Sequence, residues 1–165
     1  MGVATIRAAG LGELIVAQDS DDLLTAPGLG SCVGIAAYEK TARIAILAHV
    51  MLPGPPTAAL DPSQAARYAG PAVDAIMKQV EARGGSTKNL VIKLAGGAQV
   101  IQLAGKEDKL RIGFRNIEAV REALKVAGLR VTAEDTGGHQ GRTIIVHAAD
   151  GSVTVRVVGQ TAKPL

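Results

Sequence analysis

The stretch CVGIAAYEKTARIAILAHVML, residues 32–52, contains two apolar runs separated by a short polar segment. The runs at 32–38 and 43–52 are apolar, rich in β-branched residues and free of proline, which favours β-strands. The polar residues 39–41 between them are typical of a turn. The stretch therefore predicts an antiparallel hairpin, and the rest of the fold is built outward from it.

Two segments show the spacing of an amphipathic helix. In residues 65–83 apolar side chains recur every three or four positions, and the glycines that follow end the pattern as a C-cap would. In residues 116–128 the same spacing recurs, with Asn116 as the expected N-cap and Gly128 as the end. The sequence thus predicts two helices.

The remaining apolar runs predict further strands, at residues 13–16, 89–101, 129–135, 142–148 and 152–158. Two amphipathic helices can cover one face of a sheet while its other face packs on the remaining strands. We therefore predict an α+β fold, a layered α/β sandwich of mixed and antiparallel strands with two main helices. One domain is expected over residues 1–165, with 159–165 as a loose tail.

The composition excludes several classes of protein. Of the 165 residues 47% are hydrophobic and 20% are charged, and no apolar run reaches the ~18 residues of a membrane span, so we expect no membrane insertion. The first residues show no signal pattern, which predicts a cytoplasmic protein. The net charge of +3 is scattered and only three aromatic residues are present, which argues against nucleic-acid binding. One cysteine and three histidines without metal-ligand spacing predict neither a metal nor another cofactor.

The single cysteine, Cys32, opens the first strand of the hairpin, and His49 lies near the end of the second. Antiparallel pairing brings these two ends together, so His49 can act as the base that a nucleophilic thiol needs. The backbone N–H groups around Gly30 and Ser31 could hold an oxyanion. The alternative is a small buried cysteine and a core histidine without chemistry. His139, in the polar loop TGGHQGR, is a candidate for substrate contact.

Five motifs then occur in order: the G-S-C strand and the A-H-x-M-L-P strand within GLGSCVGIAAYEKTARIAILAHVMLP, then KLAGGAQV, IGFRNIEAVREAL and AEDTGG. Together they resemble the signature of the CheD family of chemoreceptor glutamine deamidases, from about residue 11 to residue 159. The resemblance implies that Cys32 is the nucleophile and His49 the catalytic histidine. It also implies a layered fold similar to that of the cytotoxic necrotising factor deamidase toxins.

One position departs from the family pattern. Family members commonly place a catalytic threonine six positions before the cysteine, where this chain has Ala26, with Thr25 one residue earlier. Either a bulge at Pro27 lets Thr25 reach His49, or another group, such as a backbone carbonyl, orients the imidazole. Thr25 is therefore the candidate third catalytic residue, with that alternative left open.

The resemblance implies a protein-glutamine deamidase that converts chemoreceptor glutamines to glutamates through a thioester in bacterial or archaeal chemotaxis. The partners it implies are the cytoplasmic signalling helices of chemoreceptors and a CheC-type phosphatase. One alternative is a non-catalytic binding module that stimulates such a phosphatase. A Cys–His pair could also serve a cysteine peptidase or a transglutaminase.

Overall fold

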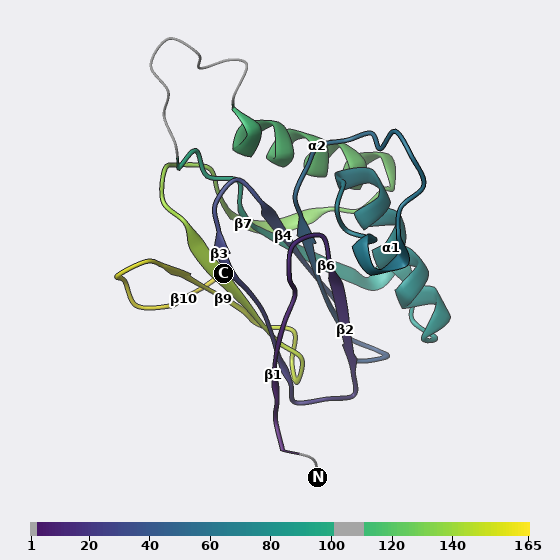
Figure 1. The fold of residues 1–165 in the computed structure, drawn as a ribbon. Helices are drawn as coiled ribbons and strands as arrows, with labels where there is room; N and C mark the ends of the chain where they lie inside the picture. Colours follow the sequence, from purple (N-terminus) through teal and green to yellow (C-terminus); the bar gives the residue numbers. More distant parts are fainter. Residues whose placement is uncertain (1–2, 101–110) are drawn as a thin grey trace.

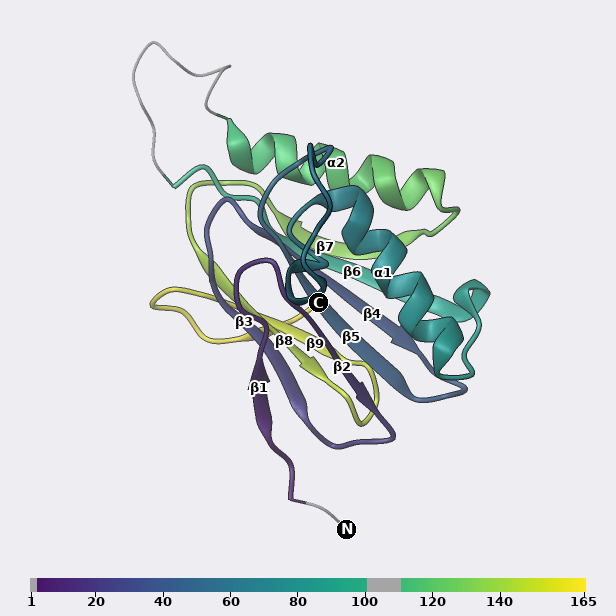
Figure 2. The same cartoon turned by 45° about the vertical axis from the view of Figure 1, so that its right-hand side comes forward.

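Two β-sheets and two helices are stacked in three layers in the computed structural model, which describes residues 3–100 and 111–165 (Figures 1 and 2). The central sheet has the strand order β2 (Leu14–Gln18), β5 (Ile44–Val50), β4 (Val33–Glu39), β6 (Leu90–Gly96) and β7 (Val131–Thr136). The outer sheet has the order β1 (Ile6–Ala8), β3 (Leu23–Leu29), β8 (Arg142–His147), β9 (Val153–Val157) and β10 (Lys163–Pro164). These layers confirm the predicted α+β class.

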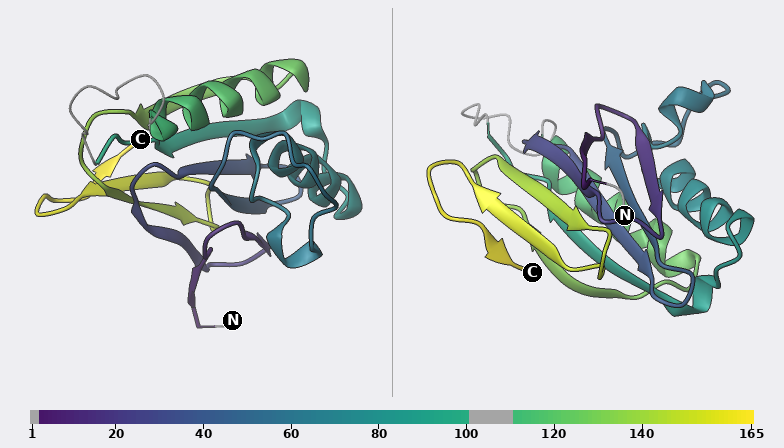
Figure 3. Two further views of the ribbon diagram at one scale, coloured as in Figure 1. Left: turned by 45° about the horizontal axis from the view of Figure 1, so that its top comes forward. Right: turned by 90° about the horizontal axis from the view of Figure 1, so that it is seen from below.

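The helices α1 (Ala69–Ala82) and α2 (Ile112–Val126) lie on the face of the central sheet that is turned away from the outer sheet (Figure 3). Two short 3-10 turns, η1 (Pro62–Gln64) and η2 (Thr87–Asn89), precede α1 and β6. In the described part of the chain, no helix is both long and apolar enough to cross a membrane.

The predicted hairpin is confirmed, and it forms the middle of the central sheet. β4 and β5 pair antiparallel, with Val33 opposite Val50 and Glu39 opposite Ile44. Every residue of both strands is buried, because alternate side chains meet the helices on one face and the outer sheet on the other. This two-sided burial explains why the sequence shows continuous apolar runs rather than alternation.

Several predicted boundaries differ from those of the structure. The first helix begins at Ala69 instead of residue 65, and α2 begins at Ile112, so Asn116 is inside the helix and is not its N-cap. The strand predicted to end at residue 101 ends at Gly96, and its predicted last residue lies outside the described residues. Strands β1 and β3 were absent from the prediction.

The expected loose tail is also different in the structure. Residues 163–164 form β10, which pairs antiparallel with β9, and the Leu165 N–H donates to the Val153 carbonyl over 2.9 Å. The Lys93 Nζ group donates to the Leu165 carbonyl oxygen over 2.8 Å. The end of the chain is thus bonded to both sheets.

The turn of the β4–β5 hairpin is held by a buried carboxylate. Glu39 is 1% exposed, and its two oxygens accept hydrogen bonds from the backbone N–H groups of Thr41 (2.8 Å) and Ala42 (3.2 Å). A one-residue slip of a strand turns each of its side chains to the other face of the sheet. Glu39 therefore helps to keep Cys32 and His49 in their positions.

We predict that Glu39→Ala lowers the free energy of unfolding by about 1–3 kcal/mol, because two turn N–H groups lose their acceptor. Lys40→Ala, at the exposed neighbouring position, is the control and should change the value by less than about 0.5 kcal/mol. Urea unfolding of the three proteins measures the difference. Equal midpoints for Glu39→Ala and the parent protein would show that the cost of burying the carboxylate cancels its hydrogen bonds.

Candidate active site

Cys32 lies in the short link, residues 30–32, that joins the end of β3 in the outer sheet to the start of β4 in the central sheet. Its side chain is partly exposed and packs against the apolar cluster between the two sheets. Desolvation by this packing raises the pKa of the Cys32 thiol above its ordinary value. At neutral pH the resting group is therefore a thiol.

His49 faces the same space as Cys32. In the β4–β5 register His49 lies opposite Gly34, and Cys32 is two residues from Gly34, so all three are on one face of the central sheet. Diagonal neighbours of this kind are ~7–8 Å apart at the backbone, within reach of long side chains. Gly34 has no Cβ, and one placed there would press on Ile144 and Leu29 of the outer sheet. The sheets can thus approach closely beside the imidazole.

The imidazole of His49 is only 4% exposed, and its two nitrogens differ sharply. Nδ1 lies 2.9 Å from the carbonyl oxygen of Ala9, whereas Nε2 has no hydrogen-bond partner among the described residues. A carbonyl only accepts hydrogen bonds, so Nδ1 carries the proton and Nε2 keeps its lone pair. His49 thus has a buried ring nitrogen that no described residue bonds, which is the arrangement that a general base needs.

Thr25 does not contact this histidine. Its hydroxyl donates to the carbonyl oxygen of Ile144 over 3.0 Å, within the outer sheet. The β3 register does shift between Ala26 and Leu29, as a bulge at Pro27 would require, but the bulge does not turn Thr25 inward. Of the two expected possibilities, the backbone carbonyl is the one that the structure places on His49.

Strand alternation explains where Thr25 points. Leu24 and Ala26 are fully buried in the cluster between the sheets, so the side chain of Thr25, which lies between them, faces the opposite side of the outer sheet. Thr25 still contributes through its backbone, because its carbonyl oxygen accepts the N–H of Ala9 over 2.8 Å. This bond holds the residue whose carbonyl orients His49.

In the link at residues 30–32 the backbone carbonyl oxygens are hydrogen-bonded, whereas the N–H groups have no acceptor among the described residues. Its three carbonyl oxygens accept bonds from Ala98 N–H (2.7 Å), Asn116 Nδ2 (2.9 Å) and Gly97 N–H (2.8 Å), in the order Gly30, Ser31, Cys32. The three N–H groups donate no hydrogen bond to the described residues. All three residues are partly exposed. The link thus offers unused donors next to the thiol.

Segment 96–99 forms one wall of this link. Gly96 has a φ of +108°, and a Cβ there would collide with the Cys32 carbonyl oxygen, so only glycine fits. His139 lies on the neighbouring loop, where its Nδ1 is 3.1 Å from the Gln99 carbonyl oxygen. The Gln99 N–H in turn donates to the Gly138 carbonyl over 2.8 Å. The structure therefore places His139 at the segment that contacts the link, without a contact to Cys32 or His49.

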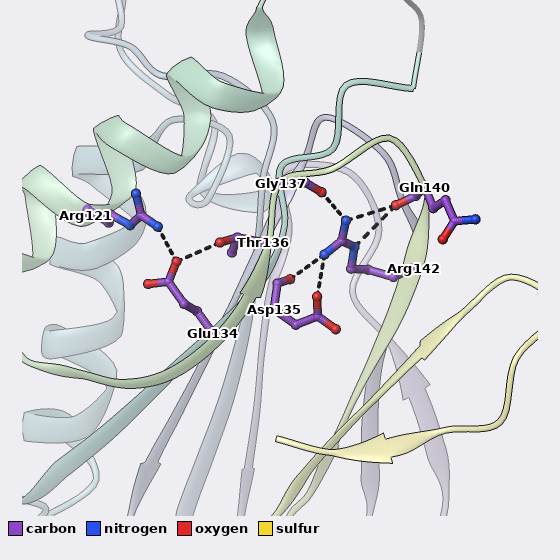
Figure 4. Close-up of polar contacts among 7 residues, drawn as sticks. All are labelled: Arg121, Glu134, Asp135, Thr136, Gly137, Gln140 and Arg142. Carbon is purple, nitrogen blue, oxygen red and sulfur yellow. Dashed lines mark hydrogen bonds and ion pairs between the residues drawn. The ribbon is translucent and has the colours of Figure 1, made fainter.

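Arg142, which the sequence analysis did not single out, organises the loop that carries His139 (Figure 4). It is 5% exposed, and its guanidinium donates to the Asp135 carboxylate (2.6 Å) and to the carbonyl oxygens of Asp135, Gly137 and Gln140. A buried charge of this kind is tolerated because each donor finds an acceptor. Nearby, Arg121 of α2 is paired with Glu134 of β7.

Asn116, expected as a helix cap, is a second residue whose position the sequence did not reveal. It is completely buried in α2, and its Nδ2 donates to the carbonyl oxygens of Ser31 and Met51, each over 2.9 Å. Ser31 precedes Cys32, and Met51 follows His49 by two residues. Asn116 thus bonds the backbone next to both candidate residues.

Among the described residues, no cluster of three or more His, Cys, Asp or Glu side chains could hold a metal ion.

The sequence is similar to known proteins over most of its length. Residues 51–157 match the sequence model of the family CheD, described as CheD chemotactic sensory transduction. A protein of Symbiobacterium thermophilum named probable chemoreceptor glutamine deamidase CheD is 42% identical over 155 residues, covering 94% of each chain. Cys32 and His49 lie too far from either end to fall in the 6% of this chain outside that match.

Two further relatives come from distant organisms. The chemoreceptor glutamine deamidase CheD of Halalkalibacterium halodurans is 37% identical over 156 residues, which cover 94% of this chain and 96% of the relative. The probable chemoreceptor glutamine deamidase CheD of Archaeoglobus fulgidus is 42% identical over 147 residues, 89% of this chain and 90% of the relative. With the match to the family model, these identities show that the chain belongs to the CheD family.

Proposed function

We propose that this protein is a chemoreceptor glutamine deamidase, which hydrolyses the side-chain amide of receptor glutamines to glutamate and ammonia in bacterial or archaeal chemotaxis. The relatives' names support the reaction and the substrate. The observation that carries the proposal is the site itself. Cys32 shares one sheet face with His49, and neither His49 Nε2 nor the N–H groups beside the thiol have a hydrogen-bond partner in the described part of the chain.

In the first step His49 Nε2 takes the proton of the Cys32 thiol as the sulfur attacks the amide carbon. The carbonyl oxygen of the substrate becomes negatively charged. The N–H groups of Gly30, Ser31 and Cys32 would bind this oxyanion, and the proposal is supported by their lack of an acceptor among the described residues and by their place beside the thiol. Protonated His49 then gives its proton to the amide nitrogen, the C–N bond breaks, ammonia leaves, and a thioester remains on Cys32.

In the second step water hydrolyses the thioester. His49 Nε2 again acts as the base, the water oxygen adds to the thioester carbon, and the sulfur leaves and regains its proton. The products are glutamate and the free thiol. Throughout both steps the carbonyl of Ala9 keeps a proton on His49 Nδ1, so that Nε2 is the nitrogen that accepts and donates the transferred proton.

The proposal extends to partners and surroundings. The substrate would be the cytoplasmic signalling helices of chemoreceptors, the protein would act in the cytoplasm, and a CheC-type phosphatase would be a binding partner. His139 would contact the substrate from the loop held by Arg142. The three-layer arrangement, with a cysteine and a histidine between two sheets, supports a likeness to the cytotoxic necrotising factor deamidases.

We predict that Cys32→Ala abolishes deamidation and that His49→Gln lowers its rate by about 10²- to 10⁴-fold, the usual contribution of a general base. The assay measures ammonia release from a folded receptor fragment and locates the new glutamates by mass spectrometry. His147→Gln is the matched control, because this histidine lies on the outer face of β8. Ammonia release by folded Cys32→Ala at the rate of the parent protein would contradict the mechanism.

We also predict that Thr25→Val keeps the deamidation rate within about threefold of the parent rate, since the hydroxyl bonds Ile144 and not His49. Loss of that bond should cost about 0.5–1.5 kcal/mol of unfolding free energy. The same ammonia assay and a urea titration measure the two effects. A rate loss of the size seen for His49→Gln would instead assign the third catalytic role to the threonine hydroxyl.

The raised pKa of Cys32 makes a prediction about its reactivity. Iodoacetamide reacts with the thiolate, so the alkylation rate follows the pKa of Cys32, which we expect to lie above the ~8.5 of a free cysteine. The pH midpoint of the alkylation rate should therefore be higher for Cys32 than for glutathione. Because the chain has one cysteine, the mass of the whole protein reports this site alone. A midpoint below that of glutathione would mean that Cys32 and His49 form an ion pair at rest.

A module that only binds and stimulates a phosphatase is the alternative. It would bind a receptor fragment or a CheC-type protein equally well with Cys32 or with alanine at this position, and neither form would release ammonia.

A further inference from the structure

We propose that Asn116 is a positioning residue for catalysis, which fixes the peptide group between Ser31 and Cys32 so that the Cys32 N–H is directed at the oxyanion. The inference rests on the proposed function, because only acyl transfer forms this oxyanion. It starts from one side chain in α2 that bonds both the link carrying Cys32 and the residue directly after β5, the strand carrying His49.

The strand ends need such a contact. The last register pair of β4 and β5 is Val33 with Val50, and beyond it the chains separate, since the Met51 N–H donates to Arg67 ahead of α1. Asn116 bridges this opening, because its Nδ2 donates to the carbonyl oxygens of Ser31 and Met51, each over 2.9 Å. The amide takes the place of backbone pairing where the two strands end.

The bond to Ser31 also acts on the next residue. A peptide group is planar, and its C=O and N–H point in opposite directions, so a donor that holds the Ser31 oxygen sets the direction of the Cys32 N–H away from Asn116. A hydrogen bond to the carbonyl also polarises the same peptide group and strengthens its N–H as a donor. Ala98 holds the Gly30 oxygen in the same way and so sets the Ser31 N–H.

The residue type supports a role beyond stability. Asparagine in the body of a helix is less favourable than a leucine such as Leu124 on the same buried face. The Oδ1 atom of Asn116 is buried and has no hydrogen-bond partner within residues 3–100 and 111–165, which is a further cost. A leucine, which branches at the same carbon, would avoid both costs but would leave the carbonyl oxygens of Ser31 and Met51 without this donor. The amide is therefore kept for its hold on these two peptide groups.

The test compares Asn116→Leu with Val120→Ala, a buried control on the same face of α2, about one turn further on. Asn116→Leu should lower kcat for receptor deamidation by on the order of 10- to 100-fold, part of the loss seen when an oxyanion donor is removed. KM should stay within about threefold of the parent value, because the bond acts in the transition state. Val120→Ala should lower the melting temperature without this loss in kcat.

Alkylation of Cys32 by iodoacetamide distinguishes a loss of N–H positioning from a general disturbance of the structure around Cys32. This reaction displaces iodide from a CH2 group and forms no oxyanion, so Asn116→Leu should alkylate within about threefold of the parent rate. The proposal is overturned if kcat for Asn116→Leu equals that for Val120→Ala, or if the alkylation rate changes as much as kcat does.

Failure of the proposed function gives a different result. If the parent protein itself releases no ammonia from the receptor fragment, the deamidase assignment falls and the role of Asn116 falls with it. If the parent protein is active and Cys32→Ala is inactive while Asn116→Leu matches Val120→Ala, only the Asn116 proposal is wrong.

Discussion

The antiparallel pairing of β4 with β5 is the constraint on which the site depends. With Gly34 opposite His49, Cys32 and His49, the proposed nucleophile and base, lie on one face of the central sheet, in the space that the outer sheet covers. A shift of one residue would turn one of them toward the helices and separate the pair. Burial of both strands on both faces opposes such a shift, because every displaced side chain would meet the wrong layer.

Three parts of the chain that are far apart in sequence converge on the link at residues 30–32. Segment 96–99 and Asn116 donate hydrogen bonds to its carbonyl oxygens. The loop that Arg142 holds accepts a hydrogen bond from segment 96–99 in turn. The contacts to the Gly30 and Ser31 oxygens fix the peptide planes that carry the Ser31 and Cys32 N–H groups, and these donate to none of the described residues. A site of this kind is preorganised by its carbonyls, so the donors need not move when charge develops on the substrate.

Much of the fold could be predicted from the sequence, and the exceptions have physical causes. The hairpin was predictable because two buried strands leave a long apolar pattern. β3 was missed because Pro27 and Gly28 are typical of a turn, whereas the strand accommodates them in an irregular register. Without β3, the alternation that turns Thr25 outward could not be applied to the site.

Asn116 shows a different limit of sequence analysis. An asparagine before an apolar helical pattern is typical of an N-cap, but α2 begins four residues earlier without any side-chain cap, so the pattern gave the wrong boundary. The true partners of Asn116 are backbone carbonyls of residues 31 and 51, and no spacing in the sequence reports a contact to a backbone atom. The same holds for the carbonyl of Ala9.

The use of a backbone carbonyl on His49 explains how the site tolerates alanine at position 26. A threonine hydroxyl can both donate and accept, so by itself it leaves open which imidazole nitrogen carries the proton. The Ala9 carbonyl only accepts, which fixes the proton on Nδ1 and the lone pair on Nε2. That carbonyl is held by strand pairing, since the Ala9 N–H bonds the Thr25 carbonyl beside β1 and β3. Orientation of the His49 imidazole thus depends on the backbone of Ala9, directly after β1, and a side chain at position 25 or 26 is not required for it.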